Sequence, residues 1–149
     1  MSGREKCLFR FRLLRLCGLK AHEHVDQRHL LELADEIRRD GELRQPVLVD
    51  ERSMVILDGH HRVAALKRLG CLLVPSYLVD YSDDQITVWP RRPDIPITKQ
   101  NVVRMGLNGT LYPPKTSRHE WPLIPPPAPV PLERLGRDPR ALRGSSAGP

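Results

Sequence analysis

The sequence contains no long apolar run, few cysteines and few aromatic side chains. No stretch approaches the roughly 20 apolar residues that a membrane-spanning helix requires, so we expect a soluble protein without membrane contact. Basic residues interrupt the apolar ones near the N-terminus, unlike the continuous apolar core of a secretory signal. Cys7, Cys17 and Cys71 form an odd set without CxxC spacing, which argues against a zinc site and favours reduced thiols in the cytoplasm.

The central part of the chain also lacks excess positive charge, although the whole protein has a formal net charge of +6. Residues 1–20 carry +5 and residues 122–149 carry +2, which leaves −1 for residues 21–121. A nucleic-acid-binding domain usually carries its positive charge on the folded body. Nucleic acid is therefore an unexpected partner for the core. The sequence does not indicate an oligomeric state.

Composition divides the chain into three parts. Residues 1–12 are predicted to be a loose basic extension, and residues 13–121 a single folded domain. Eight of the last 28 residues are proline, and little apolar surface remains there to offset the entropy of ordering the chain. We therefore predict a disordered tail over residues 122–149.

Apolar periodicity predicts an α+β fold in which helices pack on a small sheet. Asp26 and Gly41 are suited to cap a helix between them, and Thr98 and Gly109 to cap a second one. A third helix is expected after Gly59. The segments predicted to be strands are residues 13–19, 47–49, 54–57, 72–79 and 86–89.

The turn at residues 58–62 has the composition of a phosphate-binding site. Gly59 allows close backbone approach, and the helix that follows offers unpaired backbone N–H groups and a partial positive charge. His60, His61 and Arg62 add donors at the same place. The alternative is an ordinary strand–turn–helix unit whose polar side chains are only solvated.

A second polar cluster follows two prolines late in the chain. Five consecutive side chains there can donate to an anion: Lys115, Thr116, Ser117, Arg118 and His119. A basic, solvent-exposed loop is an equally good interpretation. Glu23 lies between two histidines before the first helix, and its local sequence favours a solvated loop carboxylate.

Taken together, these segments resemble the ParB/sulfiredoxin superfamily, and within it the ParB-like free L-serine kinases. The resemblance rests on Glu23 in a His-Glu context, on Asp-Gly-His-His-Arg at residues 58–62 and on Pro-Pro-Lys-Thr-Ser-Arg-His at residues 113–119. It covers roughly residues 13–121. The family commonly has a second threonine where Ser117 stands, which preserves the hydroxyl.

The resemblance implies a ParB/sulfiredoxin-like nucleotide-binding domain with a small mixed sheet. It implies an enzyme that transfers a phosphoryl group from ATP or ADP, with Mg²⁺, to free L-serine. Glu23 would be the general base, and Asp58 would hold Mg²⁺ or orient the phosphates. The residues implied to bind the nucleotide or the product are Gly59, His60, His61, Arg62, Lys115, Thr116, Ser117, Arg118 and His119.

Three alternatives remain. A DNA-partition module predicts a helix-turn-helix and a basic body, which the proline-rich residues 122–149 and the neutral core do not supply. A sulfiredoxin-like enzyme needs a reactive cysteine in the phosphate-binding turn, where this chain has His60 and His61. An inactive member that binds nucleotide as a sensor is compatible with the same residues.

Overall fold

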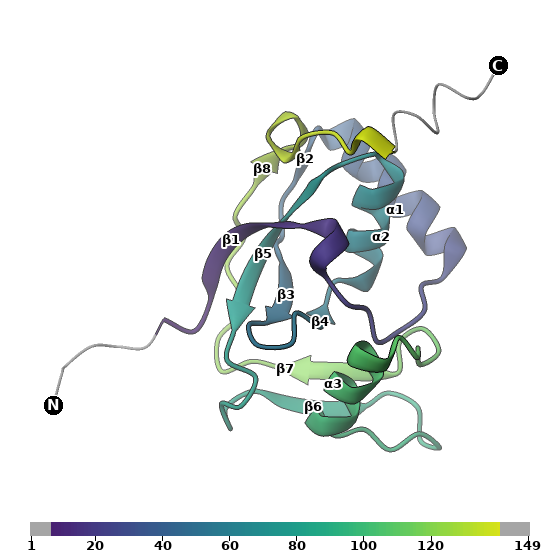
Figure 1. Ribbon diagram of the computed structural model, residues 1–149, viewed down its shortest axis with the longest axis vertical. Coiled ribbons are helices and arrows are strands. Elements are labelled where there is room, and N and C mark those ends of the chain that lie inside the picture. Colours follow the sequence, from purple (N-terminus) through teal and green to yellow (C-terminus); the bar gives the residue numbers. More distant parts are fainter. Residues whose placement is uncertain (1–6, 141–149) are drawn as a thin grey trace, which may run out of the picture.

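A four-stranded mixed sheet forms the centre of the computed structural model, which describes residues 7–140 (Figure 1). Its strands, in spatial order, are β1 (Arg10–Arg15), β5 (Leu73–Val79), β3 (Val47–Asp50) and β4 (Ile56–Asp58). The β5 and β3 strands are parallel, whereas β1 with β5 and β3 with β4 are antiparallel. The predicted α+β class with a small mixed sheet is confirmed.

Helices α1 (Gln27–Asp40) and α2 (His60–Arg68) pack together on one face of this sheet. The predicted α1 caps are confirmed: the Asp26 carboxylate accepts hydrogen bonds from two backbone N–H groups, and Gly41 has a φ of 72°. Apolar residues from both helices and from one face of β3 form the core under them. These include Leu30, Ala34, Ile37, Val47, Val49, Val63 and Leu66.

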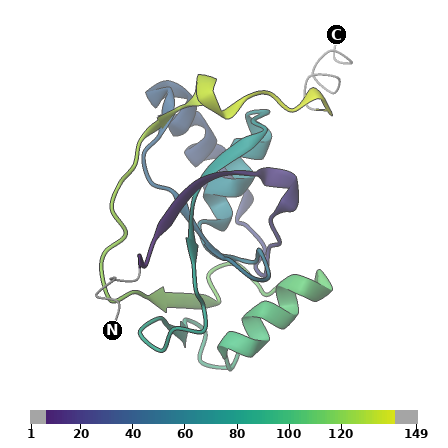
Figure 2. The same cartoon turned by 60° about the vertical axis from the view of Figure 1, so that its left-hand side comes forward.

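The other face of the sheet is covered by α3 (Lys99–Asn108) and by the antiparallel strands β6 (Thr87–Pro90) and β7 (Ser117–Glu120). Figure 2 shows α3 and β7 at the opposite end of the molecule from α1. Leu48 of β3 points into this second core, together with Val55, Ile86 and Val102. The predicted caps Thr98 and Gly109 bound α3 as expected.

The prediction of a disordered tail is wrong for residues 122–140. Strand β8 (Val130–Pro131) pairs with β2 (Glu42–Leu43), and Leu135 in the short 3₁₀ helix Leu132–Leu135 is fully buried. The Pro126 carbonyl also accepts a hydrogen bond from the Tyr77 hydroxyl at 2.7 Å. Proline has little backbone freedom to lose, so two buried side chains are enough to order this segment. Residues 141–149 lie outside the described part.

The predicted loose extension, residues 1–12, is also wrong in its last residues. The β1 strand begins at Arg10, and residues 16–18, predicted to be strand, form a 3₁₀ helix instead. Residues 1–6 of the predicted extension lie outside the described range. Between residues 7 and 140, the helices are all too short or too polar to cross a bilayer.

Gly106 provides a test of how α3 packs on the sheet. A Cβ atom at this position would lie 2.5 Å from a methyl carbon of Val55. We expect Gly106→Ala to lower the free energy of unfolding by about 1–3 kcal/mol, since overpacking outweighs the helix propensity gained. Urea unfolding measures the difference. Gly18→Ala is the matched control because no heavy atom lies within 4 Å of its added Cβ, and an equal effect of both substitutions would contradict the packing.

Candidate active site

A cavity of about 320 Å³ opens at the start of α2. It is lined by the whole turn from Asp58 to Arg62 and by Glu23, Lys115 and Ser117, which come from distant parts of the chain. The first turn of any α-helix presents backbone N–H groups without intrahelical partners, so this wall of the cavity is suited to an anion. Eight of the eleven residues that the sequence indicated are therefore brought together.

Both the backbone conformation and the packing at position 59 require glycine. Its φ is 109°, a conformation that other residues rarely adopt. A Cβ atom there would also lie 2.5 Å from a methyl carbon of Val47. The tight connection from β4 to α2 therefore depends on glycine for two independent reasons.

His60 and His61 act as hydrogen-bond acceptors toward the loop before α1. Nε2 of His60 accepts from the backbone N–H of His22 at 3.1 Å, and Nε2 of His61 accepts from that of Asp26 at 2.9 Å. Burial lowers the pKa of His60 to about 3 and also lowers the pKa of His61. Both rings are therefore neutral near pH 7, and each keeps Nδ1–H as its donor.

Arg62 is largely committed to the protein backbone. Its Nη1 donates to the carbonyl oxygens of Gln45 and Pro46, each at 2.8 Å, while Nη2 lies 3.6 Å from the Asp58 carboxylate. The Asp58 side chain remains 56% exposed and faces the cavity. Arg62 thus holds the turn in shape, and Asp58 is the accessible charge beside it.

Asp58 fits the pattern by which Mg²⁺ binds with nucleotides. Magnesium is usually held by one or two carboxylates together with phosphate oxygens, because it retains much of its hydration. Within residues 7–140 there is no cluster of three or more His, Cys, Asp or Glu side chains suited to a metal. A single exposed carboxylate beside a helix N-terminus is compatible with a metal that would arrive together with a nucleotide.

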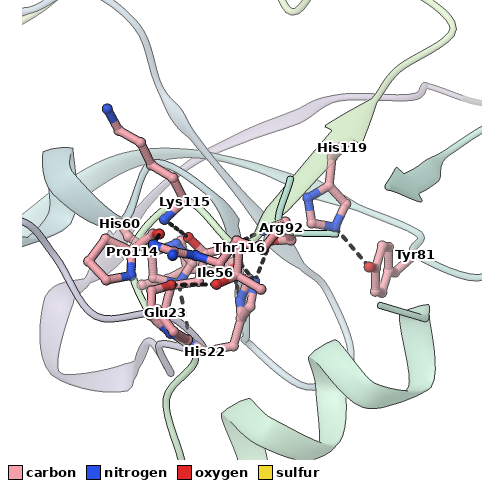
Figure 3. Close-up of polar contacts among 12 residues, drawn as sticks. His22, Glu23, Ile56, His60, Tyr81, Arg92, Pro114, Lys115, Thr116 and His119 are labelled. Carbon is pink, nitrogen blue, oxygen red and sulfur yellow. Dashed lines mark hydrogen bonds and ion pairs between the residues drawn. The ribbon is translucent and has the colours of Figure 1, made fainter. Parts of the chain in front are cut away.

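Glu23 joins the loop before α1 to the late polar segment, as Figure 3 shows. Its Oε1 accepts the N–H of Lys115 at 3.1 Å, and its Oε2 accepts both the N–H of Ser117 at 2.9 Å and the Ser117 hydroxyl. Burial alone would raise the pKa of this carboxyl, but hydrogen bonds from His22 and Ser117 lower it to about 2. Glu23 is therefore an ionised, nearly buried carboxylate, in contrast to a solvated loop residue.

The late polar segment divides between the cavity and the rest of the fold. Only Lys115 and Ser117 of its five residues line the cavity. The buried Thr116 hydroxyl donates to the Pro113 carbonyl, and Arg118 pairs with Glu120 on the exposed side of β7. The His119 ring lies 2.8 Å from the Tyr81 hydroxyl, and burial lowers its pKa to about 3.

Five residues at or beside the cavity were not predicted, among them Leu57 in its wall. His29 and Leu33, one turn apart on α1, and Arg91 after β6 line it, and the fully buried His22 lies against Glu23. The i, i+4 spacing of His29 and Leu33 could have indicated a shared face. Arg91 lies in a proline-containing stretch without periodicity, so its place depends on the pairing of β6 with β7.

Comparison with known proteins places these features in a family. Residues 11–89 match the ParB N-terminal domain, a range that includes Glu23 and the 58–62 turn but not residues 115–119. A ParB-like protein of Sulfolobus acidocaldarius is 40% identical over 75 residues, which are 49% of this chain and 37% of that protein. An ATP-dependent L-serine kinase of Staphylothermus marinus is 35% identical over 46% of this chain and 29% of its own length. An ADP-dependent L-serine kinase, SerK, of Thermococcus kodakarensis is 32% identical over 51% and 33%.

The chain thus spans about a third of the length of the curated relatives it matches. Among solved structures, a conserved hypothetical protein from Pyrococcus furiosus has a TM-score of 0.76 at 19% identity, covering 88% of this chain and 98% of that one. A free serine kinase in complex with AMP has a TM-score of 0.74 at 20% identity, covering 88% and 95%. These structures share the fold. Since the matching domain spans more than half of the sequence, the chain belongs to the ParB N-terminal domain family.

Proposed function

We propose that this protein is a kinase that transfers a phosphoryl group from ATP or ADP to the hydroxyl of free L-serine and forms O-phospho-L-serine. The observation that carries the proposal is that the Glu23 carboxylate and the N-terminus of α2 line one cavity. Relatives named as L-serine kinases, at 32% and 35% identity, support the same reaction. Those activities belong to the relatives, of which this chain covers only part.

The phosphates of the nucleotide are proposed to bind at the first turn of α2. Backbone N–H groups from His60 onward and the Lys115 ammonium would donate hydrogen bonds to the phosphate oxygens. Asp58 would hold Mg²⁺. Bound Mg²⁺ would supply neutralisation of the phosphate charge. Arg62, fixed to the Gln45 and Pro46 carbonyls, would keep the turn rigid, and its side chain also lines the cavity.

Glu23 is proposed to accept a hydrogen bond from the serine hydroxyl as it attacks. Oε1 accepts a hydrogen bond from the Lys115 N–H, which leaves a lone pair for the serine hydroxyl. A carboxyl with a pKa of about 2 is a weak base but stays ionised at every physiological pH. Phosphoryl transfer depends mainly on positioning and charge stabilisation, so a well-oriented carboxylate meets its needs.

A nucleotide-binding sensor without kinase activity is the second candidate. One observation favours it: three donors from Lys115 and Ser117 already bind the Glu23 carboxylate. In that case Glu23 would only hold the two segments together. The ParB-like name of one relative is also compatible with a regulatory role.

The direct test is to incubate the purified protein with Mg²⁺, L-serine and either ATP or ADP. We expect phosphoserine in the product mixture with at least one donor, detected by mass spectrometry. The comparison of the two donors also identifies which nucleotide is used. Clear nucleotide binding without phosphoserine from either donor would contradict the kinase and favour the sensor.

Glu23→Gln separates a role in turnover from a role in nucleotide binding. Because the amide cannot take the proton of the serine hydroxyl, we expect turnover to fall by at least about 100-fold, within the range usual for a general base. Nucleotide affinity, measured by calorimetry, should stay nearly unchanged. Glu120→Gln, on the exposed side of β7, is the matched control. A large loss of affinity in the Glu23 variant would show that Glu23 is structural or binds metal.

Lys115→Ala and Arg118→Ala test how the late segment divides. Lys115 lines the cavity, whereas Arg118 pairs with Glu120 outside it. Loss of a charged hydrogen bond costs about 1.5–3 kcal/mol, so Lys115→Ala should weaken nucleotide binding by roughly tenfold or more. Arg118→Ala should bind nearly as tightly as the unmodified protein. Equal losses in the two variants would mean that long-range charge, and not position, determines affinity.

A further inference from the structure

His22, the histidine of the His-Glu context, is fully buried beside Glu23. Its ring packs edge-on against His60, with centroids 4.5 Å apart, and lies 6.4 Å from the rings of Tyr112 and His119. Both ring nitrogens nevertheless have polar partners. A buried imidazole held at both nitrogens is fixed in orientation, so its two partners indicate what the ring does.

One nitrogen anchors the ring to the sheet. Nδ1 of His22 lies 2.8 Å from the carbonyl oxygen of Ile56, the first residue of β4. A carbonyl can only accept, so Nδ1 carries a proton and donates. This bond fixes His22 on the strand that ends at Asp58, immediately before the turn that lines the cavity.

The other nitrogen faces Ser117 and Glu23. Nε2 lies 3.0 Å from the Ser117 hydroxyl oxygen and 3.4 Å from Oε2 of Glu23. The Ser117 hydroxyl donates its single proton to Oε2. Nε2 is within hydrogen-bond distance of that same hydroxyl oxygen, so His22, Ser117 and Glu23 form one continuous chain of polar contacts.

We propose that His22 is a positioning residue that, through the Ser117 hydroxyl, fixes Oε2 of Glu23 and so directs Oε1 toward the acceptor hydroxyl. A base that is itself oriented by a third group is a common arrangement for activating hydroxyl nucleophiles. In this arrangement the Ser117 hydroxyl links His22 to Glu23, whereas the sequence suggested that it contacts phosphate. The inference about turnover rests on the proposed kinase function.

Two substitutions separate the two ends of the imidazole. His22→Asn places an amide near the Nδ1 position, where it can still donate to Ile56, but leaves nothing at Nε2. His22→Gln places an amide near the Nε2 position, where it can donate to Ser117. Loss of the comparable partner behind a metal-ligating histidine typically costs about 10–100-fold in affinity or activity. We expect that loss in kcat for His22→Asn, with KM for the nucleotide nearly unchanged, and partial recovery of kcat in His22→Gln.

His24→Asn is the matched control, since His24 is exposed on the other side of Glu23, and its kcat should equal that of the unmodified protein. Unchanged kcat in His22→Asn would overturn the proposal. So would parallel losses of kcat, nucleotide affinity and thermal stability in both His22 variants, because these would indicate a purely structural role.

Amide exchange tests the same arrangement without turnover. The backbone N–H groups of Lys115 and Ser117 both donate to Glu23, so a loosened carboxylate should speed their exchange in His22→Asn. The N–H of Val102, which donates to Thr98 within α3, is the internal reference and should not change. If the unmodified protein makes no phosphoserine, the kinase proposal fails, while unchanged exchange at Ser117 would separately refute the positioning of Glu23 by His22.

Discussion

The Glu23 carboxylate accepts hydrogen bonds from two backbone N–H groups, and these bonds hold the candidate site together. Glu23 lies before α1, whereas Lys115 and Ser117 lie more than 90 residues later, beyond the sheet and α3. Hydrogen bonds from the backbone to a charged acceptor are stronger than neutral ones, and here they are shielded from water. This carboxylate fixes the late segment beside the α2 turn, so that Lys115 and Ser117 line the cavity. Both the kinase and the sensor proposals depend on that contact.

The parts of the fold that local chemistry determines were predictable from the sequence. The caps of α1 and α3, the turn at Gly59 and the helix after it depend on residues a few positions apart. The C-terminal segment was not predictable from composition alone. Val130 lies between prolines and Leu135 among charged residues, and both order the segment by docking on distant elements. Strand alternation, applied to β7, would have separated Arg118 from Ser117 in advance.

The candidate site was predicted as three motifs, but the sequence did not reveal how their side chains are used. His60 and His61 were expected to donate to phosphate. Their Nε2 atoms accept backbone N–H groups from the loop that contains Glu23, which leaves only Nδ1–H for that role. For His22, the sequence did not indicate that its ring contacts Ile56 and Ser117. In each case the partner is more than 30 residues away, so neither spacing nor residue type carries the information.

Neutral histidines change the charge that the cavity offers to a ligand. With the ring of His60 and that of His61 uncharged, two carboxylates face three cations, Arg62, Arg91 and Lys115. Asp58 and the carbonyls of Gln45 and Pro46 already engage Arg62, so the field felt at the α2 turn is only weakly positive. A free nucleotide with several negative charges would be poorly neutralised there. The proposed nucleotide would carry less charge together with Mg²⁺ and could then use Asp58, so this balance favours the metal complex as the form in which it would bind.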